Sequence, residues 1–391
     1  MDKQTEIDIV KQCLADGITK PSEILKRLNL KYGDSEYKNT HKRVTKVVKR
    51  LSQPTFEQKL EEHNHLPTDN WQHGWLKTKE ASIFIRNDRG TINFEEVISD
   101  LFSKHIKETE VKPKAAIEVV QSEVFDRLVI ADMHIGLDPN KSGNSMYPMK
   151  WGRAEIEEAK QSIINKVIEK QVGNVLYFDN LGDYLDGYEG RTTRGTHSLE
   201  QNLSTSEMFT LGVDWMMELL IEFSSIYDRI IVRNITNDNH AGNFAHICGI
   251  AIQKLIELKF DNVEFINQTK FIDHYSVGNH LFLLCHGKDK SLMKYGFGSI
   301  PNKDNIHKIE NYISAHKLNI EKDIFIEFSK GDSHLYNADN GSSDIFAYIS
   351  YPTLAPNSEW ITTNFKKGKR GFVFYNIEMN KDNKSIHPIY L

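Results

Sequence analysis

The chain has few cysteines and no long apolar run. Its 391 residues include three cysteines, Cys13, Cys248 and Cys285, without any C-x-x-C spacing. An odd, scattered set indicates free thiols in a reducing cytoplasm rather than a disulfide framework. No apolar stretch approaches the roughly 20 residues that cross a bilayer, and no secretory signal peptide opens the chain. We therefore expect a cytoplasmic protein without a membrane partner.

The charge of the chain is unevenly distributed. The net charge is −5, but Met1 to Leu51 holds twelve basic and seven acidic residues, a net charge of +5, which leaves −10 on the rest. The length suggests two or three domains, one of them large enough for an α/β core. We therefore expect the basic N-terminal segment and the acidic remainder to belong to different domains.

Five short segments combine an apolar, β-branched run with oxygen or imidazole side chains just after it. The runs are 127–130, 175–178, 230–232, 281–284 and 324–326, and the polar segments that follow are Asp132-Met133-His134, Gly182-Asp183, Asp238-Asn239-His240, His286-Gly287 and Gly331-Asp332-Ser333-His334. Short continuous apolar runs are typical of buried strands. Because open α/β sheets bind ligands beyond the carboxyl ends of their strands, we expect the five loops to converge on one crevice.

The residue types suit a centre of two divalent ions. Two such ions about 4 Å apart polarise a phosphoryl oxygen and generate a hydroxide nucleophile, provided that a carboxylate bridges them. We predict Asp183 as this bridge. The other predicted ligands are Asp132, His134 and His334 for one ion and Asn239 and His286 for the second. His240, next to Asn239, is predicted to donate a proton to the leaving group, because imidazole has a pKa near neutrality.

The order of these motifs resembles the pattern of the calcineurin-like metallophosphoesterase superfamily. That pattern is DxH, GD, GNH, H and GHxH, and the resemblance covers about residues 125 to 391. It implies an α/β fold in which two mixed sheets pack face to face in a sandwich flanked by helices. It also implies a metal-dependent phosphoesterase with two divalent ions. We expect these ions to be Mn²⁺, with Mg²⁺, Fe²⁺ or Zn²⁺ as alternatives.

Two positions depart from the superfamily pattern. Asp238 replaces the glycine before Asn239, which is expected to alter a turn. Asp332 replaces the first histidine of the last motif, which is a ligand of the second metal in the superfamily. A carboxylate there either ligates that metal and favours hard, oxygen-preferring ions such as Mn²⁺ or Mg²⁺, or leaves the second site weaker.

The basic N-terminal segment predicts three helices. They are expected at Thr5–Leu14, from Lys20 with Pro21 in the first turn, and at Glu36–Leu51. The arrangement resembles the helix-turn-helix modules appended to phage and bacterial enzymes, which makes DNA the expected partner. The candidate DNA contacts on the third helix are Lys38, Lys42, Arg43, Lys46, Lys49 and Arg50. The alternative is a small all-α bundle with a solvated face or a protein-docking role.

The rest of the chain is expected to divide at two boundaries. Residues 1–52 would form the helix-turn-helix domain, 53–114 a connector and 115–391 the phosphoesterase domain. Within the last, the glycine-rich segment 184–197 holds Arg191 and Arg194, candidates for binding a phosphate backbone. This loop resembles those of phage phosphoesterases of the Mre11 and SbcD type, which are DNA repair exonucleases. A solvated loop is the alternative, and the sequence gives no indication of an oligomer.

Three functions are compatible with these patterns. The first is a metal-dependent DNA phosphodiesterase, or nuclease, positioned by the N-terminal module. The second is a phosphomonoesterase acting on proteins or small molecules, because the same centre serves both classes in the superfamily. The third is a DNA-binding protein with an inactive phosphoesterase domain, which Asp238 and Asp332 would explain.

Overall fold

The structure is a computed structural model that divides into two compact units, Met1–Gly90 and Thr91–Leu391. It describes residues 3–32, 34, 36–51, 73–77, 82–86, 94–107, 122–140, 149–287, 289, 298–320, 323–358, 361–362 and 368–391. Both predicted domain boundaries, at residues 52 and 114, lie outside the described residues. The second unit includes helix α5 (Phe94–Lys107), which the sequence analysis places in the connector.

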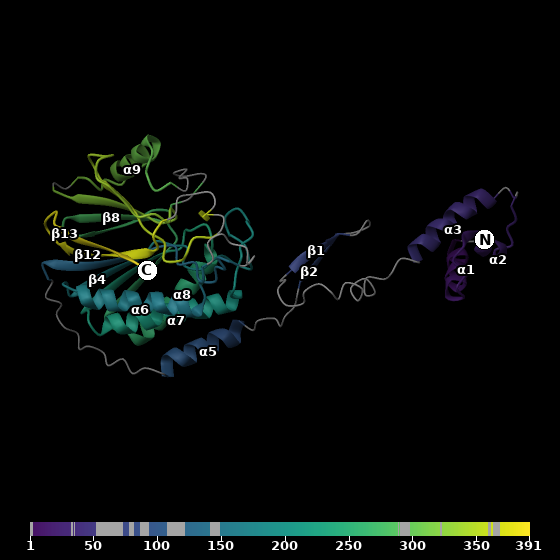
Figure 1. The fold of residues 1–391 in the computed structure, drawn as a ribbon, viewed down its shortest axis with the longest axis horizontal. Helices are drawn as coiled ribbons and strands as arrows, with labels where there is room; N and C mark the ends of the chain where they lie inside the picture. Colours follow the sequence, from purple (N-terminus) through teal and green to yellow (C-terminus); the bar gives the residue numbers. More distant parts are fainter. Residues whose placement is uncertain are drawn as a thin grey trace. The chain divides into compact units, whose positions relative to one another are not determined.

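Two mixed sheets form the body of the second unit (Figure 1), as the sequence predicts. The six-stranded sheet has the order β13-β12-β3-β4-β5-β6, and β3 to β6 run parallel. Its strands are β3 (Val124–Ile130), β4 (Val175–Asn180), β5 (Arg229–Ile235), β6 (Val263–Gln268), β12 (Gly371–Glu378) and β13 (Lys384–Tyr390). The five-stranded sheet has the order β10-β11-β9-β8-β7. Its strands are β7 (Asp273–Val277), β8 (His280–Cys285), β9 (Phe325–Lys330), β10 (Asn337–Asp339) and β11 (Ala347–Ser350).

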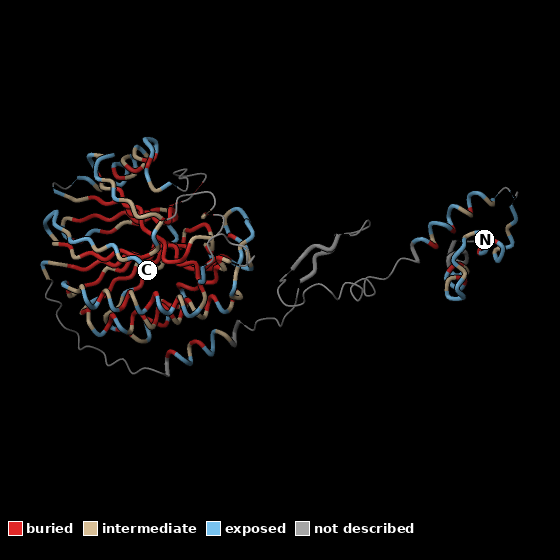
Figure 2. The backbone as a smooth tube through the Cα atoms, viewed as in Figure 1, coloured by how far each residue is buried: buried red, intermediate tan, exposed pale blue. Residues whose placement is uncertain are grey.

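Helices cover the outer faces of both sheets. In Figure 1, α6 (Arg153–Lys170), α7 (Thr205–Ser224) and α8 (Asn243–Lys259) lie against the six-stranded sheet, and α9 (Lys303–Ala315) lies against the other. Leu128 and Ile130 of β3 pack toward the helices, whereas Phe125 and Val129 pack toward the second sheet. Successive side chains of a strand point to opposite faces, so a strand buried on both faces has to be apolar at nearly every position. Figure 2 shows these strands as the most continuously buried part of the unit.

One charged residue breaks this apolar rule inside the sheet sandwich. Arg127 of β3 is 0% exposed. Its guanidinium donates to Asp179 of β4 (Nε to Oδ2, 2.7 Å) and to Glu327 of β9 (Nη1 to Oε1, 2.6 Å). It also lies 4.1 Å from the ring centroid of Phe282. Arg127 therefore joins the two sheets through a buried ion cluster.

The first unit contains the three expected helices. They are α1 (Lys3–Ala15), α2 (Pro21–Arg27) and α3 (Tyr37–Leu51), and a hairpin of β1 (His73–Lys77) and β2 (Ser82–Arg86) follows them in the chain. Buried Val10, Ile24, Leu25, Val44 and Val48 form one apolar core between the helices. Three helices are thus present where the sequence predicts them, and their role as a helix-turn-helix module stays a prediction.

Two smaller expectations concern membranes and thiols. None of the helices in the described ranges is long and apolar enough to cross a membrane. All three cysteines are free and buried, as expected. Burial raises the pKa of the Cys285 thiol, which lies at the end of β8 just before His286. A buried, protonated thiol packs as a small apolar residue, so we do not count Cys285 among the metal-binding side chains.

Candidate metal centre

The loops after five strands converge at one end of the sheet sandwich. Main-chain hydrogen bonds tie the first two loops together, from Asp132 N to Gly182 O (3.1 Å) and from His134 N to Asp183 O (2.8 Å). The last loop joins them through Asp332, whose N–H donates to both carboxylate oxygens of Asp132 at 3.2 and 3.0 Å. Residues 200 positions apart in sequence are thereby in direct contact.

The backbone of these loops is held in an unusual conformation. Asp132, His134, Asp183, Asp332 and His334 all have positive φ, between 45° and 61°. Side chains other than glycine rarely adopt this left-handed region, and such residues gather at functional sites where the surrounding structure enforces them. Gly182 also has a positive φ, +98°. Glycine is needed at this position because a Cβ there would lie only 3.0 Å from His286 Nδ1. This glycine explains why a G-D pair, rather than a lone aspartate, follows β4.

Three overlapping groups of side chains have metal-binding geometry. The ligand atoms of Asp132, His134 and His334 all lie within 4.8 Å of one another, and so do those of Asp132, Asp183 and His286 and those of His134, Asp186 and His240. Asp183 Oδ2 lies 3.2 Å from His286 Nε2 and 3.8 Å from His134 Nε2, so it faces one histidine of each group. A carboxylate shared between two ions needs this placement.

Asn239 lies on the His286 side of the centre. Its Oδ1 is 2.9 Å from His286 Nε2, which agrees with the prediction that these two residues serve the same ion. The structure thus brings together all seven residues predicted from the sequence as ligands. They are Asp132, His134, Asp183, Asn239, His286, Asp332 and His334, and each is at most 6% exposed.

The outer nitrogens of the histidines are occupied by the protein. Nδ1 of His286 lies 2.9 Å from Leu181 O, and Nδ1 of His334 lies 2.9 Å from Asn357 Oδ1. His134 Nδ1 lies 3.0 Å from Asp186 Oδ1. In each case Nδ1–H can donate outward, so Nε2 faces inward. Metal-binding histidines are oriented in this way.

Asp186 is the functional residue that the sequence analysis missed. Its Oδ1 lies 3.0 Å from Nδ1 of both His134 and His240, so a single carboxylate orients a predicted ligand and the predicted acid. His240 Nε2 then faces Asp183 Oδ2 at 3.8 Å. The spacing of Asp183 and Asp186, three residues apart after a strand, was the available signal.

Asp238 does more than alter a turn. Its carboxylate accepts hydrogen bonds from the N–H groups of Asp183 (3.2 Å), Ala241 (2.9 Å) and Gly242 (2.7 Å). It therefore links the G-D loop to the two residues that precede α8. Burial and the nearby charge of Asp183 raise the pKa of Asp238 to about 7. This residue holds the two loops together where the superfamily has a glycine.

The buried carboxylates and imidazoles of the centre balance one another. Burial lowers the pKa of His286, but the charges of Asp183, Asp132 and Asp332 and the hydrogen bond to Asp183 together outweigh it and raise that pKa to about 10. Burial also raises the pKa of Asp183, yet the charges of His286 and His240 hold it well below its usual value. Asp183 therefore stays ionised as long as positive charge lies beside it, whereas burial raises the pKa of Asp332.

Divalent ions fit this environment. His134 Nε2, one of the predicted ligand atoms, is a buried polar atom with no hydrogen-bond partner among the described residues, and Asp332 Oδ2 has no hydrogen bond there but an ion pair with Lys330 at 3.6 Å. Buried polar atoms of this kind call for an explanation such as an ion. The donor set of carboxylate oxygens, imidazole nitrogens and one amide oxygen suits ions such as Mn²⁺, Fe²⁺ and Zn²⁺.

The glycine-rich loop after Asp183 packs against the centre. Thr193 N donates to His240 O (2.8 Å), and Arg194 N donates to Asn239 O (3.2 Å). The guanidinium of Arg194 donates to Asn237 Oδ1 at 2.7 Å. Arg194 is therefore held beside a predicted ligand, whereas the side chain of Arg191 is exposed. Binding of substrate by either arginine stays a prediction.

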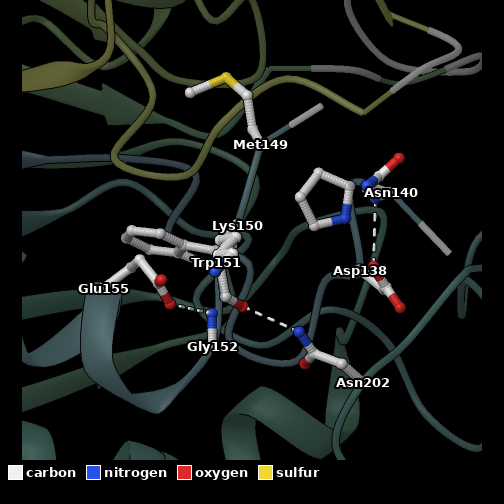
Figure 3. Close-up of a pocket in the computed structure, with 9 residues that line it drawn as sticks. Asp138, Asn140, Met149, Lys150, Trp151, Gly152, Glu155 and Asn202 are labelled. Carbon is white, nitrogen blue, oxygen red and sulfur yellow. Dashed lines mark hydrogen bonds between the residues drawn. The ribbon is translucent and has the colours of Figure 1, made fainter. Parts of the chain in front are cut away.

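A hollow of about 290 Å³ lies next to the first metal loop (Figure 3). Its lining includes Asp138, Asn140, Trp151, Glu155 and Asn202. Trp151 Nε1 donates to Met133 O at 2.9 Å, which connects the wall of the hollow to the loop of Asp132 and His134. None of the described lining residues is a predicted ligand, so the hollow is separate from the centre.

Comparisons with known proteins complete this description. No protein-family model matches the chain, and no curated protein does. Among solved structures, it aligns with a calcineurin-like phosphoesterase, YfkN from Bacillus subtilis, at 9% identity and a TM-score of 0.27, covering 68% of this chain and 90% of that one. It also aligns with "Termus thermophilus Sulfate thiohydrolase SoxB in complex with glycerol" at 9% identity and a TM-score of 0.30. That alignment covers 68% of this chain and 56% of the SoxB chain, little more than half its length. Function therefore has to be inferred from the side chains of the centre itself.

Proposed function

We propose that the chain is a calcineurin-like metallophosphoesterase that hydrolyses phosphodiester bonds of DNA. One observation carries the metal-dependent part of this proposal. Five loops, held in a left-handed backbone conformation at most of the predicted ligands, bring carboxylates and imidazole nitrogens together in overlapping groups of three, and the ligand atoms of each group lie within 4.8 Å of one another. Divalent ions held there would polarise a phosphoryl oxygen, lower the pKa of water and neutralise charge in the transition state.

The residues of the chain divide into three tasks. Asp132, His134 and His334 would hold one ion and Asn239 and His286 the other, with Asp183 shared between them. His240 would donate a proton to the leaving oxygen, and Asp186 would keep the ring of His240 turned so that Nε2 faces the centre. Mn²⁺ is the ion we propose, because the predicted ligands, with Asp332 included, supply four carboxylate or amide oxygens and three imidazoles.

DNA is the proposed substrate because of two positively charged features. On α3, the side chains of Lys38, Lys42, Lys46 and Lys49 recur every three or four residues and are all exposed, so they form one stripe along the helix. The neighbouring Arg43 is exposed as well, and the side chain of Arg50 lies outside the described residues. Lysine stripes of this kind bind the phosphates of DNA in a salt-dependent way. Arg194, beside Asn239, offers a second phosphate-binding group.

The experiment is a cleavage assay on the full chain. Labelled single- and double-stranded DNA is incubated with the purified protein and Mn²⁺, with and without a chelator. We expect metal-dependent cleavage that falls by about a hundredfold in His240→Ala, the usual contribution of a general acid. The matched control is His307→Ala, since the side chain of His307 is 73% exposed on α9. This variant should cleave like the wild type.

Other substrates give distinct outcomes of the same assay. Hydrolysis of an aryl phosphate, with no cleavage of DNA or of a bis-aryl phosphodiester, would replace the proposal with a phosphomonoesterase. DNA binding without turnover on any of these esters would replace it with an inactive phosphoesterase domain.

The basic stripe has its own test. Lys42→Glu combined with Lys46→Glu should weaken DNA binding and reduce its salt dependence by about two counterions or more. Lys254→Glu, at a side chain that is 60% exposed on α8, is the control. Equal DNA affinity in both variants would contradict a role for α3.

A further inference from the structure

A buried lysine lies beside the second metal position. Lys330, the last residue of β9, is 0% exposed. Its ammonium group donates to Gly331 O at 3.0 Å and to Ser333 Oγ at 2.5 Å. Gly287 makes room for it, because a Cβ at this position, where φ is +132°, would lie 2.6 Å from Lys330 Cε. The glycine after His286 thus allows a cation to pack against the centre.

Asp332 lies between this lysine and the second metal position. Its Oδ2 is 3.6 Å from Lys330 Nζ, and its Oδ1 is 3.9 Å from His286 Nε2. The carboxylate therefore faces a fixed ammonium group on one side and a predicted ligand on the other. In the superfamily pattern a neutral imidazole takes the place of Asp332, so here a carboxylate stands at that position with an ammonium group beside it.

The positive charge of Lys330 is expected to lower the affinity of the second metal position for a cation. A cation attracts a carboxylate and repels a second cation, and both effects are stronger in a buried site than in water. We propose that Lys330 makes the two metal positions unequal, because its ammonium group shares the charge of Asp332 and repels a cation beside His286. One ion then binds strongly at Asp132, His134 and His334, and the second binds weakly. This inference rests on the proposed metal centre and adds an order of occupancy to it.

The test is a metal titration of the full chain rather than an activity assay. Mn²⁺ is titrated into metal-free protein by calorimetry, and spin coupling between two Mn²⁺ ions is followed by electron paramagnetic resonance. In the wild type we expect one strong site and a second site at least about tenfold weaker, which is about 1.4 kcal/mol. In Lys330→Met, which keeps the length of the side chain and removes its charge, the second site should gain at least about tenfold. The spin-coupled signal should then develop at a lower Mn²⁺ concentration.

Lys384→Met is the matched control. Lys384 also pairs with a buried carboxylate, Glu327, at 3.0 Å, but this pair belongs to the Arg127 cluster. Its loss should leave both Mn²⁺ affinities unchanged.

The direction in which Lys330→Met changes Mn²⁺ affinity shows whether Lys330 acts through its charge or only by bracing its loop. If Lys330 only braced its loop through Gly331 and Ser333, Lys330→Met would weaken both ions instead of strengthening one. That result, or two equal wild-type sites that Lys330→Met leaves unchanged, would overturn the inference and leave the metal centre standing. Absence of any Mn²⁺ binding to the wild type would instead contradict the proposed function.

Discussion

Two groups of buried charge in the second unit are neutralised in different ways. Between the sheets, the carboxylates of Asp179 and Glu327 are paired with the permanent guanidinium charge of Arg127. At the ends of the strands, the carboxylates of Asp132 and Asp183 face only imidazole rings within the described ion pairs. A guanidinium keeps its proton, whereas an imidazole can give up its proton and bind a metal through the same nitrogen.

The difference separates a structural cluster from a functional one. An arginine between two sheets fixes their relative position, and removing it leaves buried charge uncompensated. A centre of imidazoles and carboxylates has a positive charge that ions can replace. We therefore expect variants of the Arg127 cluster to change stability at any metal concentration, and variants of the centre to change the response to metal.

Asp183→Asn is expected to have the largest effect. Losing the shared carboxylate removes several kcal/mol of charge stabilisation, so hydrolysis should fall by about a thousandfold. The gain in stability on adding Mn²⁺ should also disappear, whereas the wild type gains about 2.7 kcal/mol per ion at a hundredfold excess over its Kd. Thermal melts with and without Mn²⁺ measure the second effect.

Asp179→Asn is the matched control for this variant. It lies in the same strand-to-loop segment, but its side chain belongs to the Arg127 cluster. This variant should be less stable than the wild type and should still be stabilised by Mn²⁺. A loss of the Mn²⁺ response in both variants would mean that the two groups of charge are not separate.

Arg127→Met is expected to lower the free energy of unfolding by about 3–5 kcal/mol, because it leaves Asp179 buried without its guanidinium partner and Glu327 with Lys384 as its one remaining described counterion. The loss should be equal in a chelator and in Mn²⁺, as measured by urea unfolding. Adding Asp179→Asn and Glu327→Gln to the same chain should restore much of the stability, because the uncompensated charges are then gone. A loss of less than about 1 kcal/mol would contradict the role given to the cluster.

The sequence predicts the elements on which the centre depends better than it predicts the contacts between them. Strands β3, β4, β5, β8 and β9 follow from short apolar runs, because a strand buried on both faces leaves that local pattern. The seven predicted ligands were selected because each lies just after such a run. Arg127 was included in one of these runs, and nothing local marks it as the centre of a cluster. Its partner Glu327 is 200 residues away, on the other sheet.

Lys330 and Asp186 show the same limit. Lys330 is a lysine at the end of a strand, and such residues are usually exposed. Only the packing of β9 against the loop of Gly287 buries it. Asp186 was overlooked because its role is to orient His134 and His240, which lie 52 and 54 positions away. Contacts over such separations depend on the topology, which the local pattern does not contain.

Asp186→Asn sharpens the comparison within the centre. The variant keeps the shape of the side chain and removes the charge that orients His134 and His240. Loss of a residue that orients metal-binding histidines reduces metal affinity or activity by about 10–100-fold. We expect a reduction in this range in both the Mn²⁺ affinity and the turnover number. Asp138→Asn, on the same loop as His134, is the control and should change neither.

The smallest effect is expected from the acid titration of Glu327. Burial raises the pKa of Glu327, but the charges of Arg127 and Lys384 outweigh it and lower that pKa from 4.5 to about 2. A carboxyl whose pKa is lower in the folded state stabilises the fold above its unfolded pKa, and this contribution is lost as the pH falls toward the folded value. Between about pH 4.5 and pH 2 the loss is about 1.4 kcal/mol per pH unit.

Urea unfolding of the wild type and of Glu327→Gln, both in a chelator, measures this contribution. The wild type should be the more stable protein at about pH 5, and its advantage should narrow as the pH falls to about 3.5. Because the glutamine variant does not titrate at this position, the difference between the two proteins isolates Glu327 from the other carboxylates. An advantage that stays constant over this range would mean that Arg127 does not hold Glu327 in its ionised form. The Arg127 cluster would then not differ from the metal centre in having a fixed positive charge that keeps its carboxylates ionised.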